Sequence, residues 1–143
     1  MLLRAFLASA VLLAAALPAL AGDVLPGPYQ AQVVRVIDGD TFEAQIHPWL
    51  DLHVRKRVRL CGIDTPERKE PGYEEAGDRL TELAGEQVIL RNVQYDNFGR
   101  VLADVYAADG RSIAAILLRE GLAQPYEGRR KCRRIAPLGD ILP

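Results

Sequence analysis

The side chains that could carry out chemistry lie in two short stretches of the chain. Residues 36–41 read V-I-D-G-D-T, and residues 59–67 read R-L-C-G-I-D-T-P-E. Asp40 and Asp64 follow apolar, strand-like runs, so we expect both carboxylates at strand ends that the rim of a barrel could bring together. Oxygen ligands without a nearby His or Cys favour Ca²⁺ or Mg²⁺ over zinc. The alternative is that D-G-D is simply a good turn and D-T-P a good strand exit.

Two arginines and a glutamate could complete such a site. Arg59 and Arg100 come from different expected strands, and a guanidinium is a planar fork that matches the oxygens of a phosphate. Glu67 lies just beyond Asp64, where a carboxylate could accept a proton from water or orient that water. Each residue also has an ordinary interpretation. Arg59 could belong to a solvated strand face, Arg100 could be a charge after a turn, and Glu67 could be a surface loop residue.

Hydrophobic periodicity predicts the elements that must position these side chains. Five strands are expected, at residues 33–37, 41–46, 54–60, 87–93 and 100–106. In the third strand, alternation predicts that arginines 55, 57 and 59 share one face. One helix is expected between the third and fourth strands, with Tyr73, Ala76, Leu80 and Leu83 at helical spacing before Gly85. A second is expected after the fifth strand, with Ser112 as its cap and Gly121 as its stop. This order is typical of a mainly β fold with helices, a five-stranded Greek-key barrel of the OB type.

The beginning of the chain resembles a secretory signal peptide. Arg4 precedes an almost wholly apolar run over residues 5–17, and the segment to Ala21 ends in a small-x-small pattern. The apolar run is shorter than the ~20 residues that a membrane-spanning helix needs. We therefore expect residues 1–21 to be removed, leaving a protein that is exported to the periplasm or secreted, without a membrane anchor.

Length and charge set further limits. A chain of 143 residues suits one domain, which we place at residues 31–127, followed by a basic tail at 128–143. The formal net charge of −1 argues against non-specific coating of nucleic acid. It permits a locally basic wall, because the attraction of a charged ligand depends on how charge is distributed.

The cysteines and histidines offer little chemistry. Cys61 and Cys132 could pair in an exported protein, but Cys61 lies in a strand pattern, where a buried free thiol is the more common outcome. His47 and His53 flank a Pro-Trp insert and are expected in a solvated loop spanning 47–52. With two histidines and no C-x-x-C motif, the sequence gives no reason to expect a zinc site.

Taken together, the motifs resemble the staphylococcal nuclease (thermonuclease) family. V-I-D-G-D-T (36–41), R-L-C-G-I-D-T-P-E (59–67) and N-F-G-R-V-L-A (97–103) follow one another with compatible gaps. S-I-A-A-I-L-L-R-E-G-L-A (112–123) is similar to the late helix of that family and the G-L-A after it. Any one of these motifs would be weak evidence for the family. All of them in order make a specific pattern over residues 33–126.

The resemblance implies an OB-fold enzyme that uses Ca²⁺ to hydrolyse phosphodiester bonds in DNA and/or RNA. It implies products that carry 3′-phosphate and 5′-hydroxyl ends. The arginines would grip the scissile phosphate, and the glutamate would activate or place the attacking water. The implied catalytic residues are Arg59, Glu67 and Arg100, and the implied metal ligands are Asp40, Asp64 and the backbone carbonyl of Thr65.

Two aromatic residues are implied to contact the substrate, and both depart from the family pattern. Phe98 stands where a tyrosine is typical, so it could stack on a base or sugar but has no hydroxyl. Tyr126 falls near a nucleotide-stacking position, next to Pro125. The alternative function is a non-catalytic OB module that binds nucleic acid or protein, as nuclease-like domains of Tudor-containing proteins are thought to do. Such modules commonly lose the acids or arginines, which this sequence retains. We expect a monomer.

Overall fold

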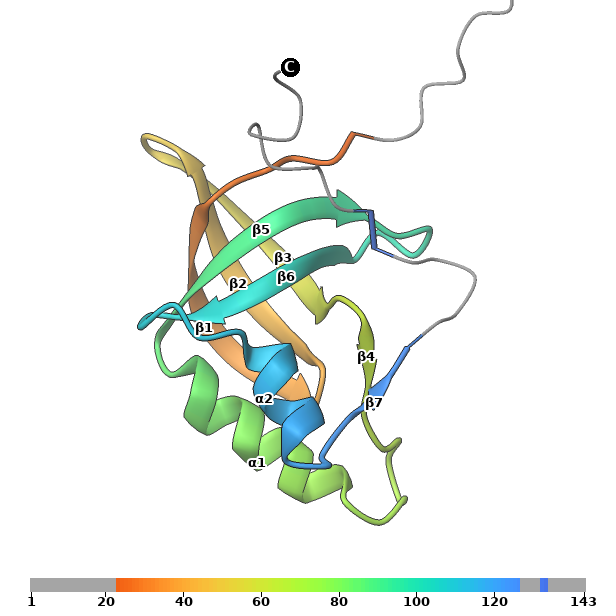
Figure 1. Cartoon of the computed structure of the whole chain (residues 1–143). Helices are drawn as coiled ribbons and strands as arrows, with labels where there is room; N and C mark the ends of the chain where they lie inside the picture. Colours follow the sequence, from red (N-terminus) through yellow and green to blue (C-terminus); the bar gives the residue numbers. More distant parts are fainter. Residues whose placement is uncertain (1–22, 127–131, 134–143) are drawn as a thin grey trace, which may run out of the picture.

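A computed structural model of the chain describes residues 23–126 and 132–133 (Figure 1). The expected signal peptide, 1–21, lies outside the described residues. The expected basic tail, 128–143, also lies outside them apart from Cys132 and Arg133. In the part of the chain that is described, neither helix has the length and apolar character needed to cross a membrane.

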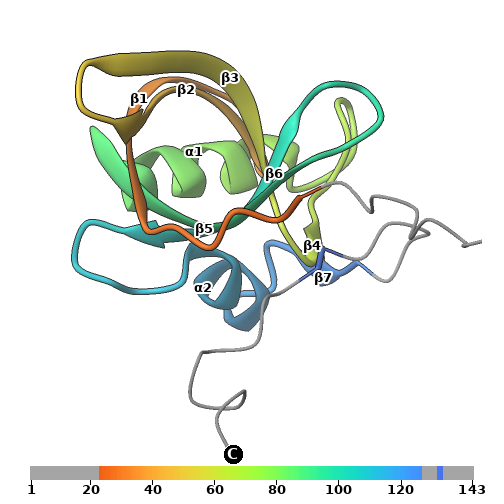
Figure 2. The same cartoon turned by 90° about the horizontal axis from the view of Figure 1, so that it is seen from above.

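Five strands close into a barrel in the order β1-β2-β3-β6-β5. Neighbouring strands are antiparallel except for β3 and β6, which run parallel. Parallel neighbours need a long connection, and here a helix and β5 lie between them along the chain. Figures 1 and 2 show this closed wall from two directions. The predicted five-stranded OB barrel is therefore confirmed, with strands at β1 (Tyr29–Asp38), β2 (Thr41–Trp49), β3 (Leu52–Leu60), β5 (Gln87–Tyr95) and β6 (Val101–Ala107).

Two helices and a small second sheet complete the domain. Helix α1 (Tyr73–Ala84) follows the third barrel strand and contacts β1, and α2 (Ile113–Arg119) follows the fifth and contacts α1. The Oγ atom of Ser112 accepts a hydrogen bond from the Ala115 amide at 3.3 Å, so the predicted cap is present. Two short strands, β4 (Ile63–Asp64) and β7 (Gln124–Pro125), pair with each other beside the barrel. This pairing brings the C-terminal part of the domain to the end of β3.

The hydrophobic core lies inside the barrel and between the barrel and the two helices. Every second residue of a strand points inward and contributes to it. In β3, Val58 and Leu60 are fully buried, whereas Arg59 between them points outward. Each fully buried aliphatic or aromatic side chain contributes about 1.5–3 kcal/mol. The packed interior therefore fixes the register of β3, and with it the outward direction of the arginines. The largest fully buried side chains include Phe42, Leu60, Ile63, Leu80, Leu90, Ile113 and Leu117.

The expected loop at 47–52 is wrong. Strand β2 continues to Trp49 and β3 begins at Leu52, so the two strands form a long hairpin. A register shift between Ile46 and Trp49 accommodates Pro48, which has no N–H to donate to the ladder. His47 and His53 are exposed as expected, but they lie on paired strands, with Nδ1 of His53 3.1 Å from Nε2 of His47.

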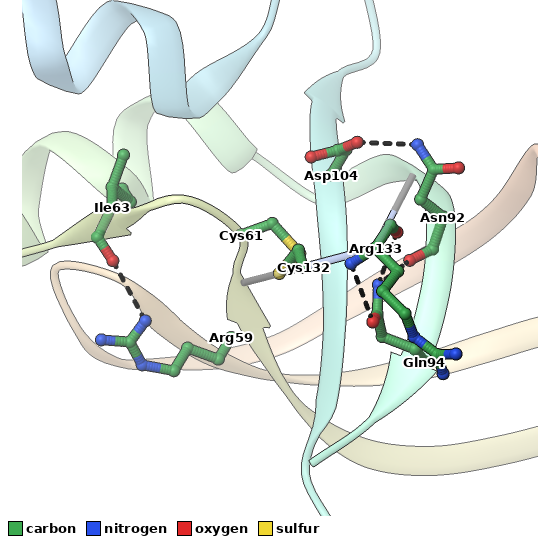
Figure 3. The surroundings of a disulfide bond; sticks show 8 residues. All are labelled: Arg59, Cys61, Ile63, Asn92, Gln94, Asp104, Cys132 and Arg133. Carbon is green, nitrogen blue, oxygen red and sulfur yellow. Dashed lines mark hydrogen bonds between the residues drawn. A yellow bond between two sulfur atoms is a disulfide. The ribbon is translucent and has the colours of Figure 1, made fainter. Parts of the chain in front are cut away.

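The expectation of a free thiol at Cys61 is also wrong. Cys61 and Cys132 form a disulfide with a Cα–Cα separation of 5.7 Å (Figure 3). The described part of the C-terminal segment is held against β5, because Gln94 Nε2 donates to the Arg133 carbonyl at 2.9 Å and the Arg133 amide donates to Gln94 Oε1 at 3.1 Å. The sequence pattern placed Cys61 in a strand but gave no position for Cys132, 71 residues later.

Candidate active site

Asp40 is a buried carboxylate at the tight turn between β1 and β2. Its Oδ1 accepts a hydrogen bond from Thr41 Oγ1 at 2.9 Å, and its Oδ2 accepts one from the Thr65 amide at 3.1 Å. Gly39 allows this close approach, because a Cβ there would lie 2.6 Å from the Cβ of Ala76 and 2.8 Å from Thr65 Oγ1. The turn and the segment after β4 are thus locked together, and residues 40 and 65 are held side by side.

Arg59 joins the two aspartates at the end of β3. Its Nη2 lies 2.7 Å from Asp64 Oδ1 and 3.2 Å from Asp40 Oδ2. Its Nη1 donates to the Ile63 carbonyl at 3.1 Å (Figure 3). The Arg59 side chain is only 15% exposed, whereas that of Asp64 is 47% exposed. The structure therefore brings both carboxylates within reach of one nitrogen atom, with Asp64 on the solvent side.

Asp38 is a carboxylate near this corner that sequence reasoning missed. Its Oδ1 accepts a hydrogen bond from the Asp40 amide at 3.1 Å. Partial burial and the negative charge of Asp40 raise the pKa of Asp38 above its usual value. The first Asp of D-G-D was the available signal, because an Asp side chain that accepts from the amide two residues on is a common turn device.

Arg100 is held by Asp96, a partner that sequence reasoning also missed. Arg100 Nε lies 2.7 Å from Asp96 Oδ2, while Asp96 Oδ1 accepts from the amides of Phe98 and Arg100 at 2.8 and 2.9 Å. Burial raises the pKa of Asp96, but these hydrogen bonds outweigh it, so the pKa lies below its usual value. Within the described part of the chain, Nη1 and Nη2 of Arg100 donate no hydrogen bond. One edge of the guanidinium is therefore fixed, and the other is available.

A single cleft of about 460 Å³ collects most of the predicted residues. The Arg59 guanidinium carbon lies 5.3 Å from the centre of the Tyr126 ring, and the Arg100 guanidinium carbon lies 5.6 Å from that of Phe98. The Tyr126 amide donates to the Gly62 carbonyl at 3.0 Å, which anchors the aromatic side of the cleft. Asp40 and Thr65 are buried and do not line the cleft. The predicted residues that line it are Arg59, Asp64, Glu67, Phe98, Arg100 and Tyr126.

The donor chemistry of the corner around Asp40 and Asp64 fits a hard divalent cation. Asp40 and Asp64 both lie within 3.2 Å of Arg59 Nη2, and repulsion from Asp40 contributes to the raised pKa of Asp38. Oxygen donors of this kind suit Ca²⁺ or Mg²⁺. Among the residues with assigned positions, no three or more His, Cys, Asp or Glu side chains are gathered as a metal site. The protein would therefore supply a partial shell, completed by water and a substrate oxygen.

Comparison with known proteins identifies the family. Residues 57–137, more than half of the chain, match the family described as "Staphylococcal nuclease homologue". The chain belongs to the staphylococcal nuclease family. The resemblance inferred from the motifs is thereby confirmed, and the closed barrel with two helices agrees with the OB fold expected for the family.

Three relatives of this staphylococcal nuclease homologue illustrate the likeness. An "Uncharacterized endonuclease" of Escherichia coli is 38% identical over 105 residues, which cover 73% of this chain and 65% of the relative. A "Micrococcal nuclease" of Shigella flexneri is 33% identical over 128 residues, covering 83% and 67%. A "Staphylococcal-like nuclease CAN1" of Arabidopsis thaliana is 37% identical over 82 residues, covering 56% and 25%. The chain thus spans a little under two thirds of the length of the Escherichia coli relative.

Proposed function

We propose that this protein is an exported, monomeric, calcium-dependent nuclease that hydrolyses phosphodiester bonds in DNA or RNA. One observation carries the proposal. Arg59 of β3 and Arg100, which lies immediately before β6, line the same cleft as the carboxylates of Asp64 and Glu67. Two relatives are named as an uncharacterized endonuclease and a micrococcal nuclease, which supports the same activity.

The two arginines bind the scissile phosphate and stabilise the charge that develops on it. Arg100 is prepared for this role, because Asp96 fixes its Nε edge and leaves the two Nη groups to donate to phosphate oxygens. Arg59 contacts both aspartates and sits at the boundary between the carboxylate corner and the cleft. Donors that are oriented before the reaction are worth most where charge grows in the transition state.

Asp40, Asp64 and the carbonyl of Thr65 would hold the cation. When bound, Ca²⁺ supplies positive charge against the phosphate and makes a nearby water more acidic. Glu67 lines the cleft on the solvent side and places the attacking water or accepts its proton. The water oxygen attacks phosphorus, the bond from phosphorus to the leaving oxygen breaks, and that oxygen takes up a proton.

The cleft also has apolar surfaces for bases or sugars. The Phe98 side chain is 80% exposed on the loop between β5 and β6, and Tyr126 stands on the other side of the cleft next to Arg59. Aromatic rings bind bases of any sequence, because every base has a π-face. This lining supports a nucleic acid substrate that is bound without sequence preference.

The proposal is tested by digestion of single-stranded DNA, plasmid DNA and RNA with Ca²⁺, with chelator, and with chelator followed by excess Ca²⁺. We expect cleavage with Ca²⁺, loss with chelator and recovery with added Ca²⁺. Failure to cleave any of the three substrates, by a protein whose fold is verified by circular dichroism, would refute the proposal. Retained binding without cleavage would favour the non-catalytic OB module instead.

A further inference from the structure

A row of arginines leads away from the cleft along the outer face of the β2–β3 hairpin. Arg55, Arg57 and Arg59 occupy alternate positions of β3 and therefore point to the same side. Arg59 lines the cleft, whereas Arg57 and Arg55 lie progressively farther along the strand. Alternate positions of a strand are about 6.6 Å apart. The arginine row thus begins at the site of the scissile phosphate and continues in regular steps.

The charges on this face are not balanced. Glu43 lies opposite Arg57 in the ladder, yet its carboxylate oxygens are taken by Arg55, at 2.6 Å, and by Arg35 of β1, at 2.7 Å. Arg57 is exposed and makes no ion pair or hydrogen bond with any residue the structure describes. Positive charge is therefore concentrated here, although the whole chain has a net charge of −1.

We propose that Arg57 and Arg55 bind successive backbone phosphates of a single-stranded polynucleotide next to the scissile phosphate held at Arg59. This inference rests on the proposed nuclease function and names the substrate as an extended strand longer than a dinucleotide. The step between neighbouring arginines is close to that between neighbouring phosphates of an extended strand, and the guanidinium fork suits phosphate better than an ammonium does. OB folds that bind single strands combine such basic tracks with aromatic stacking.

The row favours a single strand over a duplex for a geometric reason. Strand β3 curves around the wall of the barrel (Figure 2), and a flexible single strand can follow that curve. A duplex is stiff over this length, so it cannot bend to follow the same curve. The contribution of Arg57 to binding is therefore larger for single-stranded DNA than for the same sequence as a duplex.

Replacing Glu43 provides a test in which binding should become tighter instead of weaker. Hydrogen bonds from Arg55 and Arg35 lower its pKa to about 2, so it stays ionised at any working pH and holds the Nε group of each arginine. Glu43→Gln removes that negative charge from the face along which the polynucleotide would lie. We expect tighter binding of a polyanion, a result that general damage to the fold cannot produce.

The experiment measures binding by fluorescence anisotropy with chelator present, so that no cleavage occurs. The probe is a labelled DNA strand of about 12 nucleotides, within the range of site sizes known for OB folds. Arg57→Gln should weaken binding about three- to tenfold and reduce the slope of log K against log salt by about 0.7, the value for one phosphate contact on a single strand. Arg119→Gln is the matched control, because Arg119 is an exposed arginine on α2, on the other side of the barrel (Figure 2).

Four results bear on the inference. A larger loss for Arg57→Gln than for Arg119→Gln, together with tighter binding by Glu43→Gln, supports it. Equal salt slopes for the two arginine variants, weaker binding by Glu43→Gln, or an equal loss on single strand and duplex would each overturn it. Because binding is measured without metal, these outcomes are independent of whether the wild-type protein cleaves DNA. Absence of cleavage in the digestion would refute the proposed nuclease function. Arg57→Gln and Glu43→Gln variants that bind the labelled strand as tightly as the wild type would refute the role of the arginine row.

Discussion

Replacing Arg100 with lysine separates catalysis from simple attraction of phosphate. In the structure, Arg100 Nε is engaged by Asp96 at 2.7 Å, and the two Nη groups are available to the cleft. Lysine keeps the positive charge but has one ammonium group in place of a planar fork. That group can remain with Asp96 or turn to the phosphate, but it cannot reproduce the fixed geometry that serves both.

The expected size of the effect is that of losing one donor that is oriented before the reaction. Removing one pre-organised donor lowers kcat by about 10²–10³, or about 2.7–4 kcal/mol of transition-state stabilisation. Binding of a non-cleavable oligonucleotide should weaken much less, because the charge is retained. Lysine is preferable to alanine here. The Asp96 side chain is 4% exposed, and leaving its Oδ2 atom without the charged partner would cost about 1–3 kcal/mol of stability.

The assay is single-turnover cleavage of a labelled single-stranded oligonucleotide at saturating protein and Ca²⁺. Arg100→Lys should be slower by about a hundredfold or more, with a melting temperature close to that of the wild type. Arg119→Lys, which makes the same change on α2, should leave the rate unchanged. A rate for Arg100→Lys within threefold of the wild type, with binding reduced instead, would show that Arg100 serves recognition alone.

Three further outcomes are expected. Cys132→Ser should lower the free energy of unfolding by about 4 kcal/mol in urea titrations, because the disulfide closes a loop of 71 residues, and an unchanged midpoint would contradict the bond. The wild type should have a larger free energy of unfolding than Asp96→Asn. This difference should be complete above pH 3.8, the pKa of Asp96 in the unfolded chain, and should decline as the pH falls through the lowered pKa of Asp96 in the folded protein. A difference that does not change with pH would argue against the ion pair. Protein recovered from the periplasm or medium should begin at Gly22 by N-terminal sequencing, and an intact Met1 would exclude removal of the signal peptide.

Local sequence patterns predicted the barrel because burial dictates them. The alternation in β3 places Val58 and Leu60 inward and Arg59 outward, which is the arrangement found. The D-G-D turn and the end of the strand at Asp64 could likewise be predicted, because both follow apolar runs that must end at the rim of the barrel. Patterns of this kind carry information about a residue and its near neighbours.

Contacts that depend on turn geometry or on distant parts of the chain could not be predicted in the same way. The partner of Arg100 is four residues away in Asp96, but the turn that joins them is stabilised by backbone donation, which periodicity does not report. The disulfide depends on where the chain beyond β7 passes, and no pattern near Cys132 fixes that path. The extended hairpin at Pro48 required a register shift, which is a property of two paired strands and not of either one alone.

The most direct test of the account is calorimetric titration of Ca²⁺ into the wild-type protein and Asp40→Asn, with cleavage measured on the same samples. Asparagine is close in size to aspartate and removes the charge from a buried position that contacts Arg59 and Thr65. We predict one bound Ca²⁺ and Ca²⁺-dependent cleavage for the wild type, and loss of both in Asp40→Asn with the fold retained. Equal Ca²⁺ binding by the two proteins, or cleavage that persists in Asp40→Asn or in chelator, would contradict the account.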